Sequence, residues 1–331
     1  MTLDVKQYYF ESEKNRNRRD AGMKAYLIYY PYEAQKNQGF IELFQKAGRE
    51  FGIDFSYVPY SEYQQRELPN LVLNRTRNAC VSRWYEERGV RVFHSAKITE
   101  IGNHKMKTLD FLKKRLPQEI LNRKWCPETV LIPKERLDEW YQAVEQKEYG
   151  GLTEILTYMD RGETFVLKSV SGHGGSEVMA VTLHRYPEDE KQAEWEWAGF
   201  LAVLRVLRTK DCILQEMIPC KSLDVRVYIL GNRIYQGILR QGTKDFRSNF
   251  SLGGSTQAYH FSEEEKEFIQ AFIRVFAEDG LGLAGLDFII AEDGRLIFNE
   301  LEEMAGCRML YQSTGLDVVR DYVKWLSACG K

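Results

Sequence analysis

The sequence of 331 residues lacks the cysteine arrangements that define several classes of protein. Its cysteines are dispersed, with no Cys-x-x-Cys pair and no histidine cluster beside them: Cys80, Cys126, Cys212, Cys220, Cys307 and Cys329. Such spacing disfavours a disulfide framework, a zinc site and a catalytic Cys–His pair. We therefore expect the cysteines to be reduced thiols.

The sequence also lacks a long apolar run and an excess of charge of one sign. It does not start with a basic segment followed by an apolar one, and no uninterrupted apolar stretch is long enough to cross a bilayer. Lys and Arg number 46 against 48 Asp and Glu, so no general basic field favours nucleic acid or an anionic membrane. The basic run from Lys14 to Arg19 is interpreted as a solvated tail or, alternatively, as a nucleic-acid or partner contact. We expect a cytoplasmic protein without nucleic-acid or membrane partners.

Apolar periodicity predicts strands and helices along most of the chain. Hydrophobic residues make up 44% of it and charged residues 28%, as in a globular protein with two or three subdomains. Strands are predicted at 23–30, 52–60, 71–77, 90–95, 212–219, 225–230, 233–240, 284–290 and 295–301, with a hairpin at 165–181. Helices are predicted at 33–51, 78–89, 103–116, 133–147, 188–207, 262–279 and 315–328. The change of pattern near residue 100 predicts a βαβ-type opening followed by α+β architecture around a central cleft.

The segment 165–181, FVLKSVSGHGGSEVMAV, joins two apolar strands through a glycine-rich turn. Gly172, Gly174 and Gly175 let backbone N–H groups approach an anion, and Lys168 adds a positive charge. A P-loop or a dinucleotide fingerprint would continue from its glycines into a helix, whereas β-branched and apolar residues follow here. The segment predicts a phosphate-covering hairpin, with an ordinary glycine-turn hairpin as the alternative.

Carboxylates gather on a second hairpin. Asp287 lies in one predicted strand, an Asp293-Gly294 turn reverses the chain, and Glu300 and Glu302 lie in the returning strand. Residues two apart on a strand share a face, so both glutamates are expected to converge with Asp287. Oxygen ligands at this density suit Mg²⁺ or Mn²⁺, which bridge to substrate phosphates. A solvated acidic hairpin end is the alternative.

Three arginines lie between the two hairpins, on predicted strands and a loop. Arg226, Arg240 and Arg247 can clamp phosphate or carboxylate oxygens, and Asn249 and a Gly-Gly pair follow them. Surface pairing with Asp or Glu would account for any one of these arginines. Their position between a phosphate hairpin and a metal hairpin favours an anion site.

The order of these parts resembles the ATP-grasp enzymes, and within them the glutathione synthetase branch that includes glutamate ligases acting on a ribosomal protein tail. The resemblance covers roughly residues 70–326. Its matching segments are NHKMKTLDFL (103–112), FVLKSVSGHGGSEV (165–178), ILQEMIP (213–219), DVRVY (224–228), RQGTKDFRSNFSLGG (240–254) and the acidic hairpin. The resemblance implies an α+β ATP-grasp fold: a tail (1–20), a βαβ pre-ATP-grasp domain (21–100) and an ATP-grasp domain (101–331) whose lid (about 125–215) and catalytic subdomain (about 216–331) clasp ATP.

The resemblance also implies a role for each matching residue. The implied nucleotide-binding residues are Lys105, with Lys107 as a stand-in, Lys168, Gly172, His173, Gly174, Gly175, Gln215, Glu216, Met217, Ile218 and, at the ribose hydroxyls, Asp224. The residues implied to hold the transferring phosphoryl group and the substrate carboxylate are Arg226, Arg240, Arg247 and Asn249. The implied metal ligands are Asp287, Glu300 and Glu302. ATP, Mg²⁺ or alternatively Mn²⁺, and a homodimer complete what the resemblance implies.

Two positions depart from the family pattern. Many members carry Glu-x-Asn as metal ligands, whereas this chain has Glu300-Leu301-Glu302, which makes the metal site more anionic. The D-alanine–D-alanine ligase branch has an arginine two residues before the metal aspartate, where this chain has Gly285. The second departure speaks against a D-alanyl ligase.

By resemblance, the chain is expected to be an ATP-dependent carboxylate–amine ligase. A small-molecule or peptide carboxylate would attack the γ-phosphate of ATP to give an acyl phosphate, which an amine would convert into an amide with release of ADP and phosphate. Lysines, arginines and two Mg²⁺ ions would supply positioning and charge neutralisation. The glycine hairpin would close to exclude water. A small-molecule kinase of the same fold and a non-catalytic nucleotide-binding regulatory protein are the alternatives.

Overall fold

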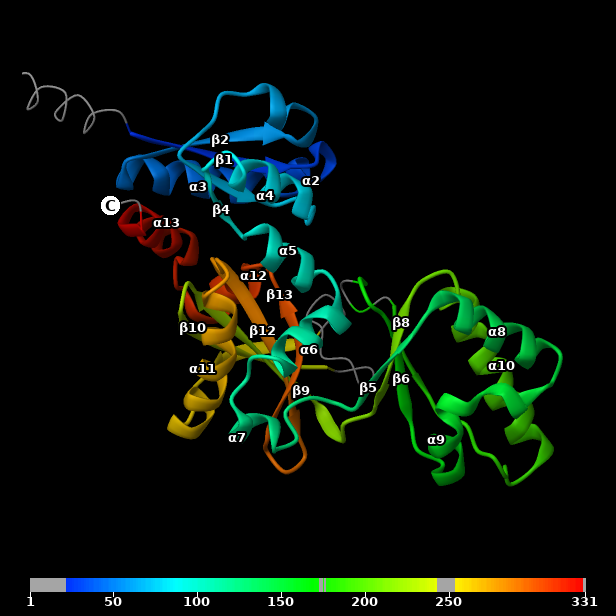
Figure 1. The fold of residues 1–331 in the computed structure, drawn as a ribbon. Coiled ribbons are helices and arrows are strands. Elements are labelled where there is room, and N and C mark those ends of the chain that lie inside the picture. Colours follow the sequence, from blue (N-terminus) through cyan, green and yellow to red (C-terminus); the bar gives the residue numbers. More distant parts are fainter. Residues whose placement is uncertain (1–21, 173–174, 176, 243–253, 330–331) are drawn as a thin grey trace, which may run out of the picture. The chain divides into compact units, whose positions relative to one another are not determined.

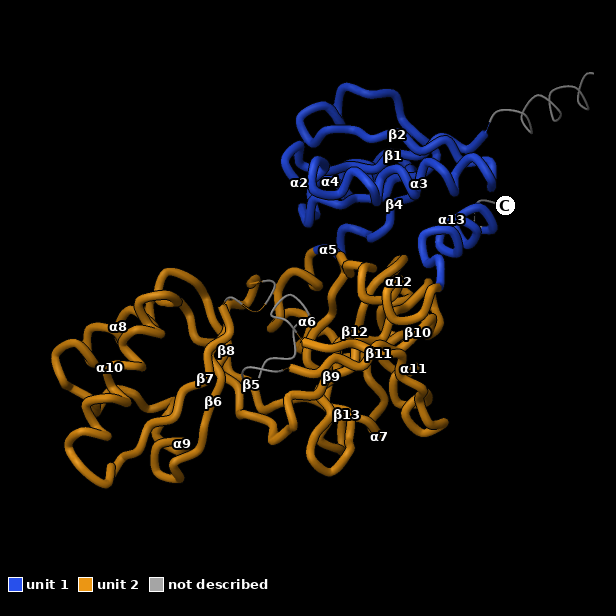
Figure 2. The backbone as a smooth tube through the Cα atoms, turned by 180° about the vertical axis from the view of Figure 1, so that it is seen from behind, with its two compact units in different colours: residues 1–99, 316–331 blue, residues 100–315 orange. Residues whose placement is uncertain are grey.

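The computed structural model describes residues 22–172, 175, 177–242 and 254–329. The chain forms two compact units, coloured separately in Figure 2: residues 1–99 with 316–331, and residues 100–315. Residues 316–331 were expected to belong with 216–315, but the structure groups them with the first unit. In the part of the chain that the structure describes, no helix is both long and apolar enough to span a bilayer.

The first unit is a parallel sheet with helices. Its strands, in the order β2-β1-β3-β4, run parallel throughout, as the βαβ-type opening predicts. Its elements are β1 (Met23–Tyr29), α2 (Pro31–Lys36), α3 (Gln38–Phe51), β2 (Ile53–Pro59), the 3₁₀ helix η1 (Tyr60–Gln65), β3 (Leu71–Asn74), α4 (Ala79–Glu86), β4 (Arg91–Phe93) and α13 (Val318–Cys329), and α5 (Ala96–Gly102) crosses its boundary. The helix predicted at 33–51 is two helices, because the chain leaves helical geometry at Asn37 (φ −110°, ψ 18°).

Aromatic packing explains why α13 joins the first unit. The ring of Tyr322 lies 6.1 Å from that of Phe44 on α3, and the ring of Trp325 lies 5.2 Å from that of Phe93 on β4. Both contacts join residues more than 200 positions apart in the sequence, and an amphipathic pattern does not specify such a partner. The periodicity therefore predicted the helix correctly but not its neighbours.

The larger unit contains two antiparallel sheets. The sheet β5-β8-β6-β7 packs on α8 and α10 through a core that includes Trp140, Phe165, Phe200 and Leu214, which are all buried. Figure 1 shows these helices beside that sheet. The elements up to this sheet's last strand are α6 (Lys105–Lys113), α7 (Gln118–Leu121), β5 (Thr129–Ile132), α8 (Lys134–Glu145), η2 (Tyr149–Gly151), η3 (Thr153–Ile155), α9 (Leu156–Arg161), β6 (Phe165–Ser169), β7 (Val178–Val181), α10 (Glu190–Leu207) and β8 (Cys212–Glu216).

The second sheet of this unit has the order β11-β10-β9-β12-β13. Phe272 on α11 packs edge-on against Phe288 of β12 at 5.4 Å and stacks on Phe298 of β13 at 5.3 Å. The Asp293-Gly294 turn between these strands is confirmed, with Gly294 at φ +84°. The remaining elements are β9 (Cys220–Leu230), β10 (Arg233–Gln241), β11 (Ser255–Tyr259), α11 (Glu263–Ala277), β12 (Leu283–Ala291), β13 (Leu296–Glu302) and α12 (Arg308–Thr314).

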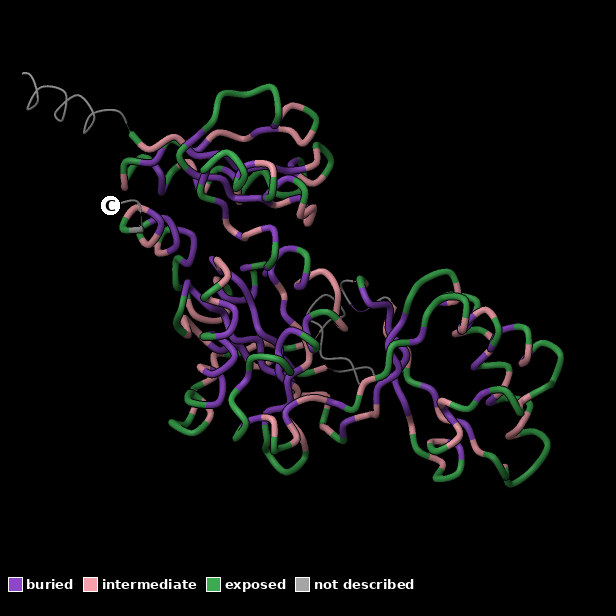
Figure 3. The backbone as a smooth tube through the Cα atoms, in the orientation of Figure 1, coloured by how far each residue is buried: buried purple, intermediate pink, exposed green. Residues whose placement is uncertain are grey.

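Burial follows the sheets. In Figure 3 the central strands are mainly buried, whereas loops and outer helix faces are exposed. Most buried residues are apolar, but a small set of charged residues is buried as well: Lys168, Glu196, Asp224, Arg226, Arg240, Asp287 and Glu303. Charged side chains are seldom buried unless they are paired. Four of these residues, Lys168, Asp224, Arg240 and Asp287, line one pocket.

Candidate active site

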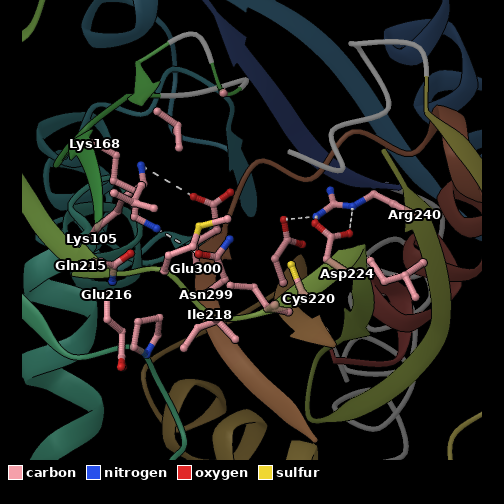
Figure 4. A pocket seen from close by; sticks show the side chains of 18 of the residues that line it. Lys105, Lys168, Gln215, Glu216, Ile218, Cys220, Asp224, Arg240, Asn299 and Glu300 are labelled. Carbon is pink, nitrogen blue, oxygen red and sulfur yellow. Dashed lines mark hydrogen bonds and ion pairs between the residues drawn. The ribbon is translucent and has the colours of Figure 1, made fainter. Parts of the chain in front are cut away.

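A pocket in the larger unit brings together residues from both of its antiparallel sheets (Figure 4). Its described lining residues are Lys105, Pro127, Val166, Lys168, Gly172, Gly175, Val178, Gln215, Glu216, Met217, Ile218, Cys220, Leu223, Asp224, Arg240, Asp287, Ile289, Asn299 and Glu300. Most of the residues implied by the family resemblance are therefore in one place. Arg226 and Glu302 are not among the described lining residues, and His173, Gly174, Arg247 and Asn249 lie outside the part that the structure describes.

Two lysines reach the pocket from different elements. Lys168 is on β6, the middle of three hydrogen-bonded strands, and only 5% of it is exposed. Burial lowers the pKa of Lys168 to about 8, and nearby Lys105 lowers it too, against the raising effect of Glu300. Lys105 is the first residue of α6, and its Nζ donates a hydrogen bond of 2.7 Å to the Gly172 carbonyl oxygen. Lys107, by contrast, is half exposed and pairs with Glu100.

The glycine segment follows β6 directly. The strands β6 and β7 pair antiparallel, so the predicted hairpin geometry is confirmed at its two arms. Gly175 has φ +78°, a left-handed conformation that favours glycine. A Cβ atom at Gly172 would lie 2.7 Å from the Glu177 carboxylate, so a larger residue would require the Glu177 side chain to move.

The last residues of β8 and the segment after it border the pocket with polar and apolar groups. The amide of Gln215 donates to the Thr129 hydroxyl at 2.7 Å, and the Glu216 carboxylate accepts from the Glu128 backbone N–H at 2.6 Å. Glu216 also pairs with Lys124. These contacts hold the Gln215 and Glu216 side chains against β5 and the residues that precede it. Met217 and Ile218 add apolar surface, which suits the flat face of a base.

Four buried charges form a continuous cluster across three adjacent strands. Arg226 of β9 lies opposite Asp287 of β12 and binds both of its carboxylate oxygens at 2.7 Å. Arg240 of β10 lies opposite Asp224 of β9, binds its two oxygens at 2.5 and 2.7 Å, and donates to Asp287 at 2.7 Å. These are bidentate, charge-assisted contacts, which fix the geometry strongly.

The arginines keep the buried carboxylate ionised. Burial alone would raise the pKa of Asp287, but the charges and hydrogen bonds of Arg226 and Arg240 outweigh it and lower that pKa to about 2. The same pairing raises the pKa of Arg226 well above its usual value against the effect of burial. Cations therefore do lie among the predicted metal carboxylates, and in the structure these cations are arginine side chains.

The predicted metal ligands have different surroundings. Glu300 lies opposite Asp287 in the β12–β13 pair, lines the pocket and is 3.6 Å from Lys105 Nζ. Glu302 is 3.6 Å from an Arg226 nitrogen. Within the described ranges, no group of three or more His, Cys, Asp or Glu side chains could hold a metal ion. Two carboxylates facing a pocket still fit Mg²⁺, which binds through one or two carboxylates together with water and substrate phosphates.

Gly285 packs closely against the side chain of Arg226. A Cβ atom at this position would lie 3.2 Å from Cδ of Arg226, which is tighter than an ordinary van der Waals contact. The glycine therefore leaves room for the Arg226 side chain beside Asp287. An arginine at this position, as in D-alanyl ligases by family resemblance, would compete with Arg226 for the same space.

Sequence reasoning missed two polar pocket residues, Asn299 and Cys220. Strict strand alternation places Asn299 on the opposite face from Glu300, but the register of β12 and β13 shifts between Asp287 and Phe288, and both residues line the pocket. The sequence carries no clear signal for this bulge. In the sequence, Cys220 stands out only as one of the dispersed thiols.

The fold identifies a class of protein. D-cycloserine synthetase DcsG superposes with a TM-score of 0.62 over 93% of this chain and 100% of that one, at 14% identity. The ATP-grasp ligase PsnB in complex with a minimal precursor, Mg and ADP gives a TM-score of 0.59 over 93% and 97%, at 16% identity. The three sheets thus form an ATP-grasp fold, with a pre-ATP-grasp domain and two ATP-grasp subdomains, and this confirms the predicted fold class.

Sequence comparison gives the family. Residues 146–326, more than half of the chain, match the RimK-like ATP-grasp domain, and the chain therefore belongs to the RimK-like ATP-grasp family. It is 26% identical over 172 residues to a probable alpha-L-glutamate ligase of Methanococcoides burtonii, covering 51% of this chain and 52% of that protein. A probable alpha-L-glutamate ligase 1 of Shewanella oneidensis is 28% identical over 173 residues, with 52% of each chain covered. The chain spans about half the length of the curated relatives it matches.

Proposed function

We propose that this chain is an ATP-dependent ligase that joins a carboxylate to an amine. The observation that carries the proposal is one pocket, in a chain of the RimK-like ATP-grasp family, that combines Lys105 and Lys168 with Asp287 and Glu300. Lysines suit the phosphates of a nucleotide, and carboxylates suit the Mg²⁺ that accompanies them. This pairing of charges favours phosphoryl transfer.

The proposed roles follow the positions of the side chains. Lys168 and Lys105 bind nucleotide phosphates, and Asp287 and Glu300 hold Mg²⁺, which would neutralise charge on the phosphate oxygens when bound. Arg240 lies in the pocket wall, where its guanidinium is held by Asp224 and Asp287. A fixed cation of this kind stabilises developing negative charge without reorganising.

The reaction we propose has two steps. The substrate carboxylate attacks the γ-phosphorus of ATP, the bond to the β-phosphate oxygen breaks, and ADP leaves. An amine then attacks the acyl phosphate carbon, an amide forms and phosphate departs with one oxygen of the original carboxylate. Further contacts with the phosphoryl group or the substrate are proposed for Arg226, Arg247 and Asn249. Glu302 is proposed as a metal ligand.

Substrate classes are proposed from the relatives. The curated relatives are described as probable alpha-L-glutamate ligases, and PsnB was crystallised with a precursor peptide. We therefore propose an amino acid such as L-glutamate as the amine, and a peptide or a small molecule as the carboxylate. The D-alanyl ligase branch has, by family resemblance, an arginine where this chain has Gly285, and this difference speaks against D-alanine as the substrate.

The test is release of ADP and phosphate from MgATP with pooled amino acids, small peptides and polyamines, followed by mass spectrometry of the mixture. ADP release that depends on the pool, with a new mass equal to two components less one water, supports the ligase. A product heavier by a phosphoryl group would instead indicate a kinase. ATP binding without turnover in any pool would indicate a regulatory protein.

A further inference from the structure

The bulge in β13 changes which side chains face the pocket. Asp287 lies opposite Glu300 and Phe288 lies opposite Phe298, so Asn299 is the extra residue on its strand. Consecutive residues of a regular strand point to opposite faces, whereas a bulge can turn two neighbours to the same side. Asn299 and Glu300 both line the pocket as a result.

Each of these two neighbours meets one of the pocket lysines. Nζ of Lys168 donates a hydrogen bond of 2.9 Å to Oδ1 of Asn299, and Nζ of Lys105 lies 3.6 Å from the Glu300 carboxylate. Figure 4 shows the two lysines on the same side of the pocket as these residues, away from the Arg240–Asp224 pair. The Lys168–Asn299 contact joins the two antiparallel sheets of the larger unit, since β6 belongs to one and β13 to the other.

The chemistry of the two contacts differs. Glu300 is an anionic neighbour that pairs with Lys105 and also acts on Lys168 through its charge, whereas the amide oxygen of Asn299, which accepts the hydrogen bond from Lys168, is neutral. Lys168 is almost fully buried, so its ammonium needs a hydrogen-bond partner, and an amide can orient it while the positive charge stays available to an anion. A carboxylate at the same position would orient the ammonium and neutralise it.

We propose that Asn299 is a positioning residue that holds the Lys168 ammonium at the pocket for a nucleotide phosphate without cancelling its charge. This inference rests on the proposed function, in that it takes the pocket's ligand to be a nucleotide. It goes further because it gives a role to a residue for which the family resemblance implies none, and it predicts that the neutrality of this residue matters.

A double-mutant cycle on nucleotide affinity tests the proposal. The dissociation constant of MgADP is measured by calorimetry for the wild-type chain, Asn299→Ala, Lys168→Ala and the double variant, with melting temperatures in parallel. Asn299→Ala is expected to weaken binding about tenfold in the wild-type background and less than about twofold when Lys168 is already absent, since the residue acts through the lysine. Asn122→Ala, an exposed amide on the loop after α7, serves as the matched control and is expected to bind as the wild type does.

A charge substitution separates positioning from simple packing. Asn299→Asp keeps the acceptor oxygen, so a residue needed only to satisfy Lys168 would tolerate it. Our proposal predicts instead that Asn299→Asp retains the melting temperature yet weakens binding of metal-free ADP at least as much as Asn299→Ala does. For this comparison the wild-type chain and both variants are measured in EDTA, so that the new carboxylate cannot recruit a metal ion. Should Asn299→Ala lower the melting temperature, Asn299→Ser replaces it in the cycle.

The outcomes separate this inference from the proposed function. Equal losses from Asn299→Ala in both backgrounds, or wild-type affinity in Asn299→Asp, would overturn the positioning role while leaving the ligase proposal intact. Failure of the wild-type chain to bind ADP at all would overturn both. A non-additive cycle together with a weakened Asn299→Asp variant would support the role.

Discussion

The two antiparallel sheets of the larger unit treat buried charge in different ways. In the five-stranded sheet, Arg226 and Arg240 each lie directly opposite a carboxylate and bind it through two hydrogen bonds. In the four-stranded sheet, Lys168 is buried with a neutral amide as its hydrogen-bond partner. The first arrangement fixes geometry, and the second leaves a cation able to bind an anion.

This difference assigns separate tasks to the two sheets. Breaking a buried ion pair by removing one partner is strongly destabilising, because it leaves the other charge buried and uncompensated. A buried ammonium beside an amide gains from an incoming phosphate, since the interaction is formed in a low-dielectric pocket. We therefore expect substitution of Arg226 to lower stability strongly, whatever it also does to turnover, and substitution of Lys168 to affect mainly nucleotide binding and turnover.

The largest expected effect is on stability. Arg226→Leu leaves the buried Asp287 with half of its compensating charge, and breaking such a pair costs about 3–5 kcal/mol. The free energy of unfolding is measured by urea denaturation. Arg185→Ala removes an exposed pair with Asp160 in the same unit and is the matched control, expected to unfold like the wild type. Equal urea midpoints for Arg226→Leu and the wild type would contradict the view that the paired charges of the five-stranded sheet stabilise the fold.

The next effect concerns turnover. Lys168→Ala removes a preorganised cation from the phosphate region and is expected to lower ADP formation at least about 100-fold, the effect of losing one such electrostatic contact. Its unfolding midpoint should stay near that of the wild type, since burial of the ammonium is itself unfavourable. Lys191→Ala, on the exposed face of α10, is the control and should keep full activity. Wild-type turnover in Lys168→Ala contradicts the assignment.

The pH dependence of nucleotide binding tests whether the charge of Lys168 binds the nucleotide. The pKa of Lys168 is lowered to about 8, chiefly by burial, so the free protein loses this positive charge as pH rises through that value. The dissociation constant of ADP is therefore expected to be level from pH 7 to about 8 and then to increase, by at most tenfold per pH unit. Lys168→Arg keeps its charge over this range, so whatever affinity it retains should not show this rise. A flat profile to pH 9.5 for the wild type would count against Lys168 as the binding cation.

The smallest expected effect is at Gly285. Gly285→Ala places a methyl group 3.2 Å from Cδ of Arg226, whose guanidinium is held by Asp287 and cannot move aside freely, and we expect a loss of about 1 kcal/mol in unfolding free energy. Gly199→Ala on α10 meets no atom within 4 Å and should instead stabilise by about 0.5–1 kcal/mol, because alanine favours a helix. Differential calorimetry of the two variants checks the opposite signs.

The sequence predicted those features of the fold that depend on local pattern. Alternating apolar residues predicted the arms of both hairpins, and the glycine turn and lysine of 165–181 were visible because they are contiguous. The pairing of Arg226 with Asp287 could not be predicted in this way, because it requires β9 to lie beside β12. A local pattern does not specify which strands are neighbours. The position of α13 in the first unit was missed for the same reason.

The sequence predicted the site residues that lie in recognisable motifs. It did not predict those whose orientation depends on the register between strands. Lys105, Lys168, Asp287 and Glu300 stand in segments that resemble the family, and the structure brings them to one pocket. Asn299 escaped because a bulge of one residue reverses the face expected from alternation. Predictions for His173, Gly174, Arg247 and Asn249 lie outside the described residues.

Oxygen transfer tests the central proposal most directly. The chain is incubated with MgATP and a pool of amino acids and small peptides whose carboxylates carry ¹⁸O, and the released phosphate is examined by mass spectrometry. A ligase that proceeds through an acyl phosphate transfers one carboxylate oxygen to phosphate, so we predict one ¹⁸O atom per phosphate formed. Unlabelled phosphate formed together with an amide product would contradict the proposed mechanism.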